Sequence, residues 1–538
     1  MPSPITLQGI GSLTAPGVYG QLNLGASQNS VASAVYPVVF LGNIGSAGSA
    51  YATAGNVVYG PDTQTPMQSE NDAINLFTAG SPLHLAIAAF MAVNKTTPVY
   101  AIPVPEATAG TAASMTFTVT ANGISGNPVQ SSGLVQIKVD GKVPVQVQVG
   151  ATDTASTIAS NIAKNINGNV KLPVTASALA ATVTVTAKVK GQRSNWIRVY
   201  PKVLSGSGVT LSVNVPTFMT SGAGSDAAGY VTALNTLATS GASGGFYYYY
   251  IPEAGWDSVD GYNSVTGYAN GPVSLIQAQL DTLMQPTSGL RQRALFASID
   301  TLSSSITTTF SNNDARCEAI WCKNADITPF EFASKWAAAV TVFETYPLSV
   351  GGVNFDSFGG DAVSASYWSL PSPDDGSAPS TTDIQTAILS GLSPVRVTRG
   401  GRTNVVKRVT AHCQQTVGAS TVSDYRIVDS GKVTISDYFL NDLIQLISIR
   451  YPRCVIVTDP TQGQPANPPS TVCAGQIRDV VIEVVNNYAS ANLVDASKII
   501  PGVIVQRETN PTTTISVEVP LYTNDCLHIV ALLVNQVS

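Results

Sequence analysis

The segment Tyr36-Pro-Val-Val-Phe-Leu41 decides the fold, because it is an apolar run of strand length that predicts a buried strand. Two predicted helices follow, over Gln68–Phe77 and Pro82–Asn94, and Gly80 ends the first of them. A second buried strand is predicted at Pro98–Val104. Strands that alternate with helices predict an α/β layer.

The sequence changes character between residues 106 and 220, where Thr, Val, Ala and Gly dominate and alternating strands are predicted. Asp140-Gly141 lies between two of these strands and indicates a hairpin. A helix is predicted over Thr154–Asn165, with Asp153 or Thr154 as its N-cap. This part of the chain therefore predicts a separate β-rich domain that is inserted into the α/β layer.

The α/β pattern returns after the insertion. The predicted elements are, in chain order, helix Ser225–Thr239, strand Phe246–Pro252, helix Val273–Leu283, strand Arg293–Ile299, strand Glu318–Trp321 and helix Thr328–Phe343. Residues 350–382 are rich in Gly, Ser, Pro and Asp and mark a loop or boundary. The last part predicts strands at Val395–Thr398 and Val405–Thr410, helices at Ser436–Arg450 and Cys473–Tyr488, and strands at Val503–Glu508, Thr514–Val519 and Leu527–Val534.

These elements predict an α/β (α+β) multidomain protein with a mixed-sheet core, an inserted β-rich domain and an extended arm at each end. The predicted parts are an N-terminal arm (1–25), the first part of the core (26–106), the inserted domain (107–222), the second part of the core (223–394), a C-terminal domain (395–525) and a C-terminal arm or strand (526–538). The first 25 residues carry no charge and show no helical period, which is why we interpret them as an arm.

Charge content limits the function classes. Charged residues make up 11% of the chain, less than half of the roughly 25% typical of soluble domains, and the formal net charge is −6. Because interface cores are depleted in charged residues, this composition is typical of a protein whose surface is covered by other subunits. A secreted β-rich protein of the Ser/Thr type has the same composition. The negative charge argues against nucleic acid as a partner.

The start of the chain does not resemble a secretory signal, because residues 1–17 have no basic start and no apolar stretch of sufficient length. The longest apolar run, Leu83–Val93, is far shorter than the roughly 20 residues that cross a bilayer. The six cysteines form no C-x-x-C pair, and we interpret them as reduced core thiols. We therefore expect a protein made without secretory export and without membrane insertion.

Two patterns that suggest catalysis or cofactor binding lie in an unsuitable context. Gly241-Ala-Ser-Gly-Gly245 matches G-x-S-x-G, which needs a strand before the serine and a helix after it, whereas the predicted order here is the reverse. Gly222-Ala-Gly-Ser-Asp-Ala227 resembles a dinucleotide loop, but Glu253 is its best acidic partner and follows a proline. We interpret Ser225 or Asp226 as an ordinary helix cap. No catalytic residue and no cofactor are predicted.

The histidines and cysteines do not form a metal motif. His412 adjoins Cys413, but adjacent residues of a strand point to opposite faces. Cys317 and Cys322 have no histidine near them, and His84 lies within a predicted apolar helix. No metal site is predicted.

One stretch of thirteen residues concentrates basic side chains and contains no acid: Arg396, Arg399, Arg402, Lys407 and Arg408. A solvated hairpin face is one interpretation. The other is a patch that meets an acidic surface of a partner protein. Nucleic acid is a poorer candidate partner, because no aromatic residue lies between the basic ones.

Several motifs, taken in order, resemble the contractile tail sheath proteins of Mu-like bacteriophages. Pro16-Gly17-Val18-Tyr19 resembles the start of that family's arm, and Thr97–Pro103 resembles the strand that closes its first section. Similar segments of the inserted domain are Val139–Val143, Thr152–Ile158 and Leu172–Ser177, and similar C-terminal segments are Val405–Thr410, Tyr451–Arg453, Thr509–Pro511 and Ile515–Pro520. Thr410-Ala-His-Cys413 departs from the family pattern. The order and spacing of the motifs across nearly the whole chain carry the resemblance.

The resemblance implies a non-enzymatic structural subunit of a virion, assembled in the host cytoplasm. Such subunits polymerise as stacked hexameric rings around a tail tube and contract to drive the tube through the host envelope. The implied partners are further copies of the chain, the tail tube protein, and the baseplate and tail terminator proteins, with no nucleic acid and no membrane insertion. The arm residues that would join neighbours are Pro16, Gly17, Val18, Tyr19, Leu527, Ile529, Val530 and Leu532. The C-terminal domain would be the inner one, with the basic patch facing the tube.

Two other interpretations remain at the level of sequence. A different self-assembling protein, such as a tail tube or surface-layer subunit, has the same composition. A serine hydrolase built on Gly241–Gly245 ranks last, because a helix precedes that segment and a strand follows it.

Overall fold

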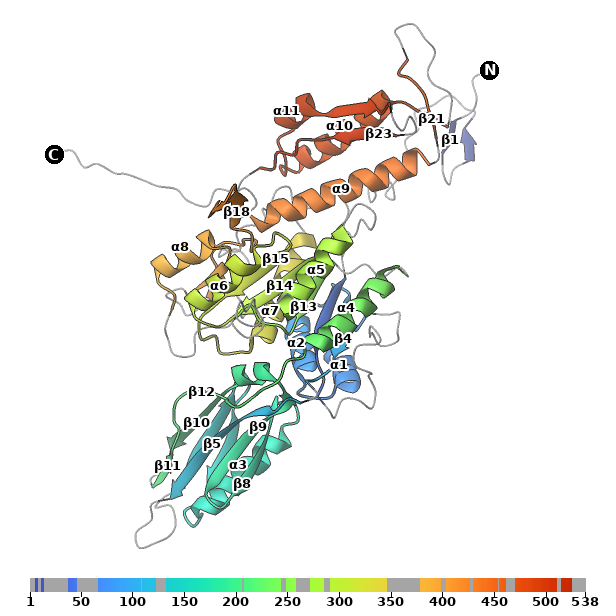
Figure 1. Ribbon diagram of the computed structural model, residues 1–538. Coiled ribbons are helices and arrows are strands. Elements are labelled where there is room, and N and C mark those ends of the chain that lie inside the picture. Colours follow the sequence, from blue (N-terminus) through green and yellow to red (C-terminus); the bar gives the residue numbers. More distant parts are fainter. Residues whose placement is uncertain are drawn as a thin grey trace, which may run out of the picture. The chain divides into compact units, whose positions relative to one another are not determined.

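The computed structural model describes residues 5–7, 11–13, 37–45, 66–107, 109–121, 132–205, 208–242, 248–257, 271–284, 291–345, 378–397, 403–425, 429–452, 454–460, 470–509 and 514–524 (Figure 1). The chain forms a larger unit (Val35–Thr345, Asn354–Val433 and Cys526–Ser538) and a smaller unit (Met1–Ala34, Tyr346–Val353 and Thr434–Asp525). The expected α/β multidomain fold, with helices and several mixed sheets, is confirmed.

A seven-stranded sheet with the order β17-β16-β15-β14-β13-β3-β4 forms the centre of the larger unit. Its strands are β3 (Val38–Asn43), β4 (Val99–Val104), β13 (Tyr249–Pro252), β14 (Arg293–Ser298), β15 (Cys317–Trp321), β16 (Ser393–Val397) and β17 (Thr403–Val405). All neighbours are parallel except β17, which is antiparallel to β16. The chain passes from β3 to β4 on one side and from β13 to β16 on the other, so the strand order reverses between β3 and β13.

Helices cover both faces of this sheet. On one face α1 (Glu70–Phe77), α2 (Pro82–Met91) and α7 (Pro329–Thr345) pack on Val38 and Phe40. On the other face α4 (Ala227–Ala242), α5 (Pro272–Met284), α6 (Leu302–Asn312) and α8 (Thr381–Leu389) pack on the side of Val39 and Leu41. Strands buried on both faces consist of continuous apolar residues, which is why the segment 36–41 identified the sheet.

The inserted domain is a sandwich of two antiparallel four-stranded sheets, with the orders β12-β10-β6-β7 and β11-β5-β9-β8. Its elements are β5 (Ala112–Ala121), β6 (Gly133–Val139), β7 (Val145–Val149), α3 (Ala155–Gly168), β8 (Val174–Leu179), β9 (Thr182–Lys190), the 3₁₀ helix η3 (Gln192–Trp196), β10 (Arg198–Ser205), β11 (Val209–Leu211) and β12 (Thr217–Phe218). Strands β6 and β7 form the hairpin expected at Asp140-Gly141. Thr154 is the N-cap of α3, and its side chain accepts the Thr157 amide.

Helix α3 also contacts one edge strand of each sheet of the sandwich, β7 and β8. The Asn165 side chain donates to the Gln146 carbonyl of β7 at 3.1 Å. The Asn167 side chain donates to the Ala176 carbonyl of β8 at 2.7 Å and accepts its amide at 2.8 Å. Unpaired edge groups are a template for pairing with another chain, so these two asparagines oppose strand addition at β7 and β8.

The smaller unit contains helices and short two-stranded sheets. Its elements are β1 (Ile5–Leu7), β2 (Gly11–Leu13), β20 (Val455–Ile456), β21 (Thr471–Val472), α10 (Ala474–Ser490), α11 (Ala496–Ile499), the 3₁₀ helix η4 (Ile500–Gly502), β22 (Ile504–Arg507) and β23 (Ile515–Glu518). Helix α10 buries an apolar stripe that includes Ile477, Val481 and Val485. Helix α9 (Ser430–Arg450) begins in the larger unit and continues into the smaller one.

Several local predictions differ from the structure, and strands β8 and β10 of the inserted domain were among the elements not predicted. Helix α9 begins at Ser430, six residues before the predicted start at Ser436. The predicted strand Val405–Thr410 is replaced by β17, which ends at Val405, and by irregular chain that leads to the hairpin of β18 (Gln414–Val417) and β19 (Ser420–Ser423). Helices α6 and α8 were not predicted. Their Ser- and Thr-rich sequences favour loops when tertiary contacts are unknown.

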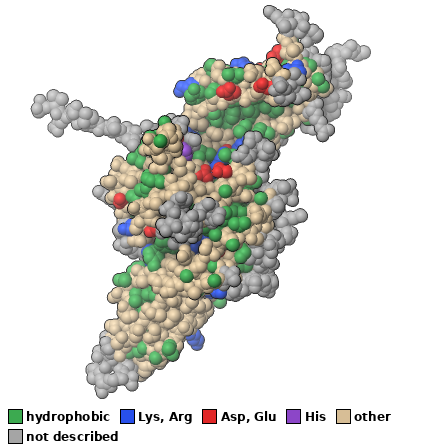
Figure 2. All heavy atoms as spheres, viewed as in Figure 1, with side chains coloured by type: hydrophobic (Ala, Val, Ile, Leu, Met, Phe, Trp, Pro, Cys, Tyr) green, Lys and Arg blue, Asp and Glu red, His purple; other side chains and the backbone are tan. Residues whose placement is uncertain are grey.

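The surface is poor in charge. Figure 2 shows Lys, Arg, Asp and Glu side chains as few and scattered on the face in view, between apolar and uncharged polar atoms. Among the described residues, no helix combines the length and the apolar character needed to cross a bilayer.

Candidate functional site

The first place to search for a site is the carboxyl edge of the seven-stranded sheet. In open α/β sheets ligands bind at the carboxyl ends of the strands, where the strand order reverses. That position here lies between β3 and β13, at Asn43 and Glu253. The Glu253 carboxylate accepts the Asn43 amide at 2.6 Å and is itself 7% exposed.

The inserted domain fills this crevice. Arg193 of η3 binds both carboxylate oxygens of Asp226, with 2.8 Å between Nη2 and Oδ1, and its guanidinium lies 5.1 Å from the centre of the Tyr230 ring. Two cavities remain beside Arg193 and Glu253, with volumes of about 40 and 20 Å³. These volumes hold a few water molecules, whereas ligand pockets typically measure about 300–1,000 Å³. The usual ligand site of this fold class is therefore occupied by the protein itself.

The structure also places the two sequence patterns that suggested catalysis or cofactor binding. Asp226, in the loop-like Gly222–Ala227 segment, is held by Arg193 just before α4 begins. Helix α4 precedes and β13 follows the segment Gly241–Gly245, as the sequence indicated. Residues 243–245 lie outside the described residues.

A larger groove of about 360 Å³ runs along α1, α2 and the start of β4. Glu70 and Asn94 of its lining have partners in the structure. Glu70 binds Lys171 at 2.8 Å and His84 at 3.3 Å. Asn94 donates to Thr97 and to Thr341, both at 2.8 Å. The groove lining thus presents no nucleophile paired with a base among the described residues.

The histidines have structural partners. His84 is buried, and its Nδ1 atom accepts the Gly80 amide at 3.0 Å, which secures the turn between α1 and α2. Burial lowers the pKa of His84. The Nε2 atom of His412 lies 3.0 Å from the buried carboxylate of Asp424. Among the described residues, no three His, Cys, Asp or Glu side chains are grouped to hold a metal ion.

The basic cluster is not one continuous surface patch. Arg396 is exposed on β16, and Lys407 pairs with Asp429 at 2.5 Å. Arg408 is fully buried, so its predicted place in a surface patch is wrong. The chain turns inward after β17 because the buried carboxylate of Glu318 on β15 binds the Arg408 guanidinium. Arg399 and Arg402 lie outside the described residues.

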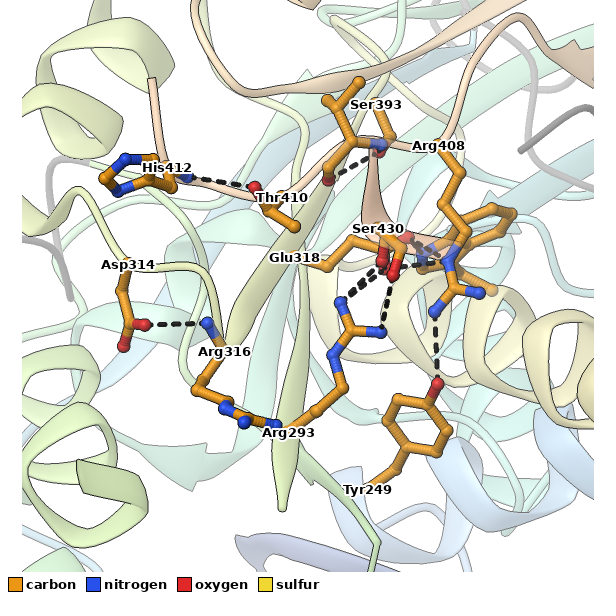
Figure 3. A network of polar contacts seen from close by, with 12 residues as sticks. Tyr249, Arg293, Asp314, Arg316, Glu318, Ser393, Arg408, Thr410, His412 and Ser430 are labelled. Atoms are coloured by element: carbon orange, nitrogen blue, oxygen red, sulfur yellow. Dashed lines mark hydrogen bonds and ion pairs between the residues drawn. The ribbon is translucent and has the colours of Figure 1, made fainter. Parts of the chain in front are cut away.

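Arg408 belongs to a buried polar network (Figure 3). Its Nε atom lies 2.9 and 2.8 Å from the two carboxylate oxygens of Glu318, and its Nη2 atom donates to Tyr249 at 3.1 Å. Arg293 binds Glu318 at 3.7 Å and the Ser430 hydroxyl at 2.5 Å. Ser430 in turn donates to Glu318 at 2.6 Å. The network therefore joins three strands to the first residue of α9, which explains why this helix begins earlier than its sequence indicated.

The smaller unit contains open strand edges. Strands β22 and β23 form a two-stranded antiparallel sheet, so within the described residues each strand has one edge without a partner strand. Ile504 is 50% exposed and Val517 is 36% exposed. Unlike β7 and β8 of the inserted domain, these edges show no side-chain asparagine contact within the part of the chain that the structure describes. They are available to an added strand.

The predicted arm residues, in the segments 16–19 and 527–532, lie outside the described residues. Sequence analysis missed the open edges of β22 and β23 and the network around Glu318. The alternation in Ile515–Glu518 signalled a strand, but no residue pattern reveals whether a strand has a partner on both sides.

Comparison with solved structures finds chains that are similar over part or most of their length. The chain is similar to the sheath tail protein Lin1278 from Listeria innocua, with 13% identity, a TM-score of 0.43, and coverage of 93% of this chain and 94% of that one. It is also similar to a chain of the anti-feeding prophage baseplate, with 10% identity, a TM-score of 0.34, and coverage of 56% and 72%. No protein-family model and no curated protein matches the chain.

Proposed function

We propose that this chain is the structural subunit of a contractile tail sheath, which polymerises as stacked hexameric rings around a tail tube. The observation that carries the proposal is the open two-stranded sheet of β22 and β23, in a chain whose motifs resemble Mu-like sheath proteins in order and spacing. The filled crevice of the larger unit and the low surface charge support a protein that works by assembly instead of catalysis.

In this proposal the segments 1–25 and 526–538 of neighbouring copies add strands to β22 and β23. A strand that makes four or five hydrogen bonds contributes roughly 2–7 kcal/mol at 0.5–1.5 kcal/mol per bond. Along the tail, contacts of this head-to-tail kind do not close, so they build a helical polymer. The baseplate and terminator proteins would bound the polymer, and contraction would be a rigid-body rearrangement of the subunits.

Electron microscopy of the purified full-length protein tests the proposal. We expect hollow cylinders built of six-fold rings. The axial distance between successive rings should take one value before mild destabilisation and a second value after it. Such cylinders would separate a sheath from a tail tube or surface-layer subunit, whose polymers keep a fixed repeat. A protein that stays monomeric at high concentration, or a lattice with one repeat under all conditions, would contradict the proposal.

Of the predicted basic patch, Arg396, Arg399 and Arg402 remain our proposed contacts to the tube. Changing all three to Glu is expected to prevent assembly on isolated tubes, because like charges would then oppose an acidic tube surface. The measurement is co-sedimentation of sheath protein with tubes at low salt. Lys202→Glu, on an exposed position of the inserted domain, is the matched control and should sediment like the wild type. Unchanged sedimentation of the triple variant would favour the solvated-face interpretation.

A further inference from the structure

The inserted domain rests on the larger unit through the turn between β6 and β7. A Cβ atom on Gly141 would lie 2.8 Å from Cγ2 of Ile327, so this turn packs closely on the loop that links β15 to α7. Arg198 of β10 reaches the same loop and donates to the Asn324 carbonyl at 3.1 Å. We call this contact, made by residues 138–142 and 198 with residues 324–331, the junction.

Two buried carboxylates of the junction are incompletely paired. Asp140 is 4% exposed; its Oδ1 atom accepts the Arg198 amide at 2.8 Å, and its Oδ2 atom has no hydrogen-bond partner among the described residues. Glu331 of α7 is 3% exposed; its Oε2 atom binds Lys142, and its Oε1 atom has no hydrogen-bond partner among the described residues. Buried polar atoms almost always have a partner, so each exception needs an explanation.

The cations of the junction favour ionised Asp140 only in part, because Lys142 and Arg198 lower its pKa by less than burial raises it. Lys138 pairs with Asp326 at 3.6 Å, and Lys142 pairs with Glu331. The Arg198 guanidinium lies over the Phe218 ring, 4.2 Å from its centre, and donates to a carbonyl. The remaining charged or titratable groups are Lys335 of α7 and the buried His84 of α2, and burial lowers the pKa of each. The two other acids thus each have a lysine partner, whereas the partner shown for Asp140 is a neutral amide.

We propose that Asp140 holds a proton while the inserted domain is seated on the larger unit, and that loss of this proton unseats the domain. A protonated Asp140 carries no buried charge beside the Glu331 carboxylate, and its hydroxyl becomes a donor. The ionised form would place a second negative charge in the same buried junction.

The charges around Asp140 determine how the seating of the inserted domain depends on pH. Burial, followed by repulsion from Glu331, raises the pKa of Asp140 from 3.8 to about 8. In the unseated domain Asp140 meets water and has its ordinary pKa, so seating takes up a proton. The equilibrium constant for seating therefore falls as the pH rises from 3.8 to about 8, by up to tenfold per pH unit, and is constant above that range.

Hydrogen exchange of full-length wild type and Asp140→Asn at matched pH tests the proposal. Asn tolerates the positive φ of 47° at this position, can still accept the Arg198 amide and carries no charge. We expect junction amides to exchange faster in the wild type than in D140N, with a ratio that grows through this pH range and then levels off. Comparison at equal pH cancels the intrinsic dependence of exchange on pH.

Two further measurements separate unseating from unfolding. Helix α3 belongs to the inserted domain but is not part of the junction. The ratio of its amide exchange rates in wild type and D140N should therefore not change with pH. In a Glu331→Gln background the junction ratio should still rise with pH, but it should level off at a lower pH. The reason is that repulsion from Glu331, one cause of the raised pKa of Asp140, is removed while burial remains. A junction ratio independent of pH, or an equal change in α3, would overturn the proposal.

Discussion

The double variant Val505→Pro/Val517→Pro is expected to abolish polymerisation while the monomer remains folded. Glu508 donates to the Thr514 carbonyl at 2.9 Å, and hydrogen-bonded pairs alternate along an antiparallel ladder. The register pairs Val505 with Val517, so their amides point away from the hairpin toward the two open edges. Proline at these positions removes the donors that an added strand needs and leaves the hairpin bonds in place.

Threonine at the same two positions is the matched control, because it keeps the amides and a β-branched side chain. Electron microscopy and sedimentation velocity would show polymers for the threonine variant and monomers for the proline variant. The single proline variants identify which edge receives the strand. Deleting residues 1–25 or 526–538 should also abolish polymerisation, because it removes a segment that would supply the added strand. Normal cylinders from the double proline variant would refute strand addition at this sheet.

The second large effect is expected at Glu318, where the carboxylate lies between two buried guanidinium groups. Glu318→Gln keeps the volume of the side chain but leaves Arg293 and Arg408 without a counter-charge, with both side chains fully buried. Breaking a buried ion pair in this way costs roughly 3–5 kcal/mol. We expect a clear fall of the urea midpoint of the larger unit, followed by the fluorescence of its buried tryptophans.

Two variants serve as comparisons for this prediction. One removes a carboxylate near the surface, and the other replaces all three charged residues of the network with apolar ones. Asp326→Asn removes a partly exposed pair with Lys138 and should change stability by less than about 1 kcal/mol. The triple variant Arg293→Met/Glu318→Leu/Arg408→Met should be much closer to wild type than Glu318→Gln, because no unpaired charge is left. Equal midpoints for Glu318→Gln and wild type would show that the network does not stabilise the fold.

Sequence predicted the parts of the fold that depend on local pattern. The apolar runs at 36–41 and 98–104 identified β3 and β4 because parallel strands are buried on both faces. The Asp140-Gly141 pair identified a hairpin, because few residues adopt the backbone of a tight turn. Thr154 was one of two N-caps considered, and the structure selects it.

The remaining features depend on tertiary contacts. Helix α6 consists largely of Ser and Thr, whose hydroxyls bond the carbonyls four residues earlier, as Thr309 does to Ser305 at 3.0 Å. Such sequences favour turns until a sheet packs against them. Arg408 appeared to belong to a surface cluster because its partner, Glu318, is ninety positions away in sequence. No local pattern shows that a carboxylate on another strand will draw a cation inward.

The attachment of the inserted domain has a consequence for how such chains diversify. Thr111 and Ala223 exchange both backbone hydrogen bonds, at 2.9 and 3.1 Å, so the chain enters and leaves the sandwich at one point. A short turn from Glu106 to Asp226 would close the larger unit without moving β4 or α4. The whole sandwich can therefore be replaced by another domain, in evolution or by engineering. The replacement domain must supply an arginine for Asp226 and cover the crevice at Glu253.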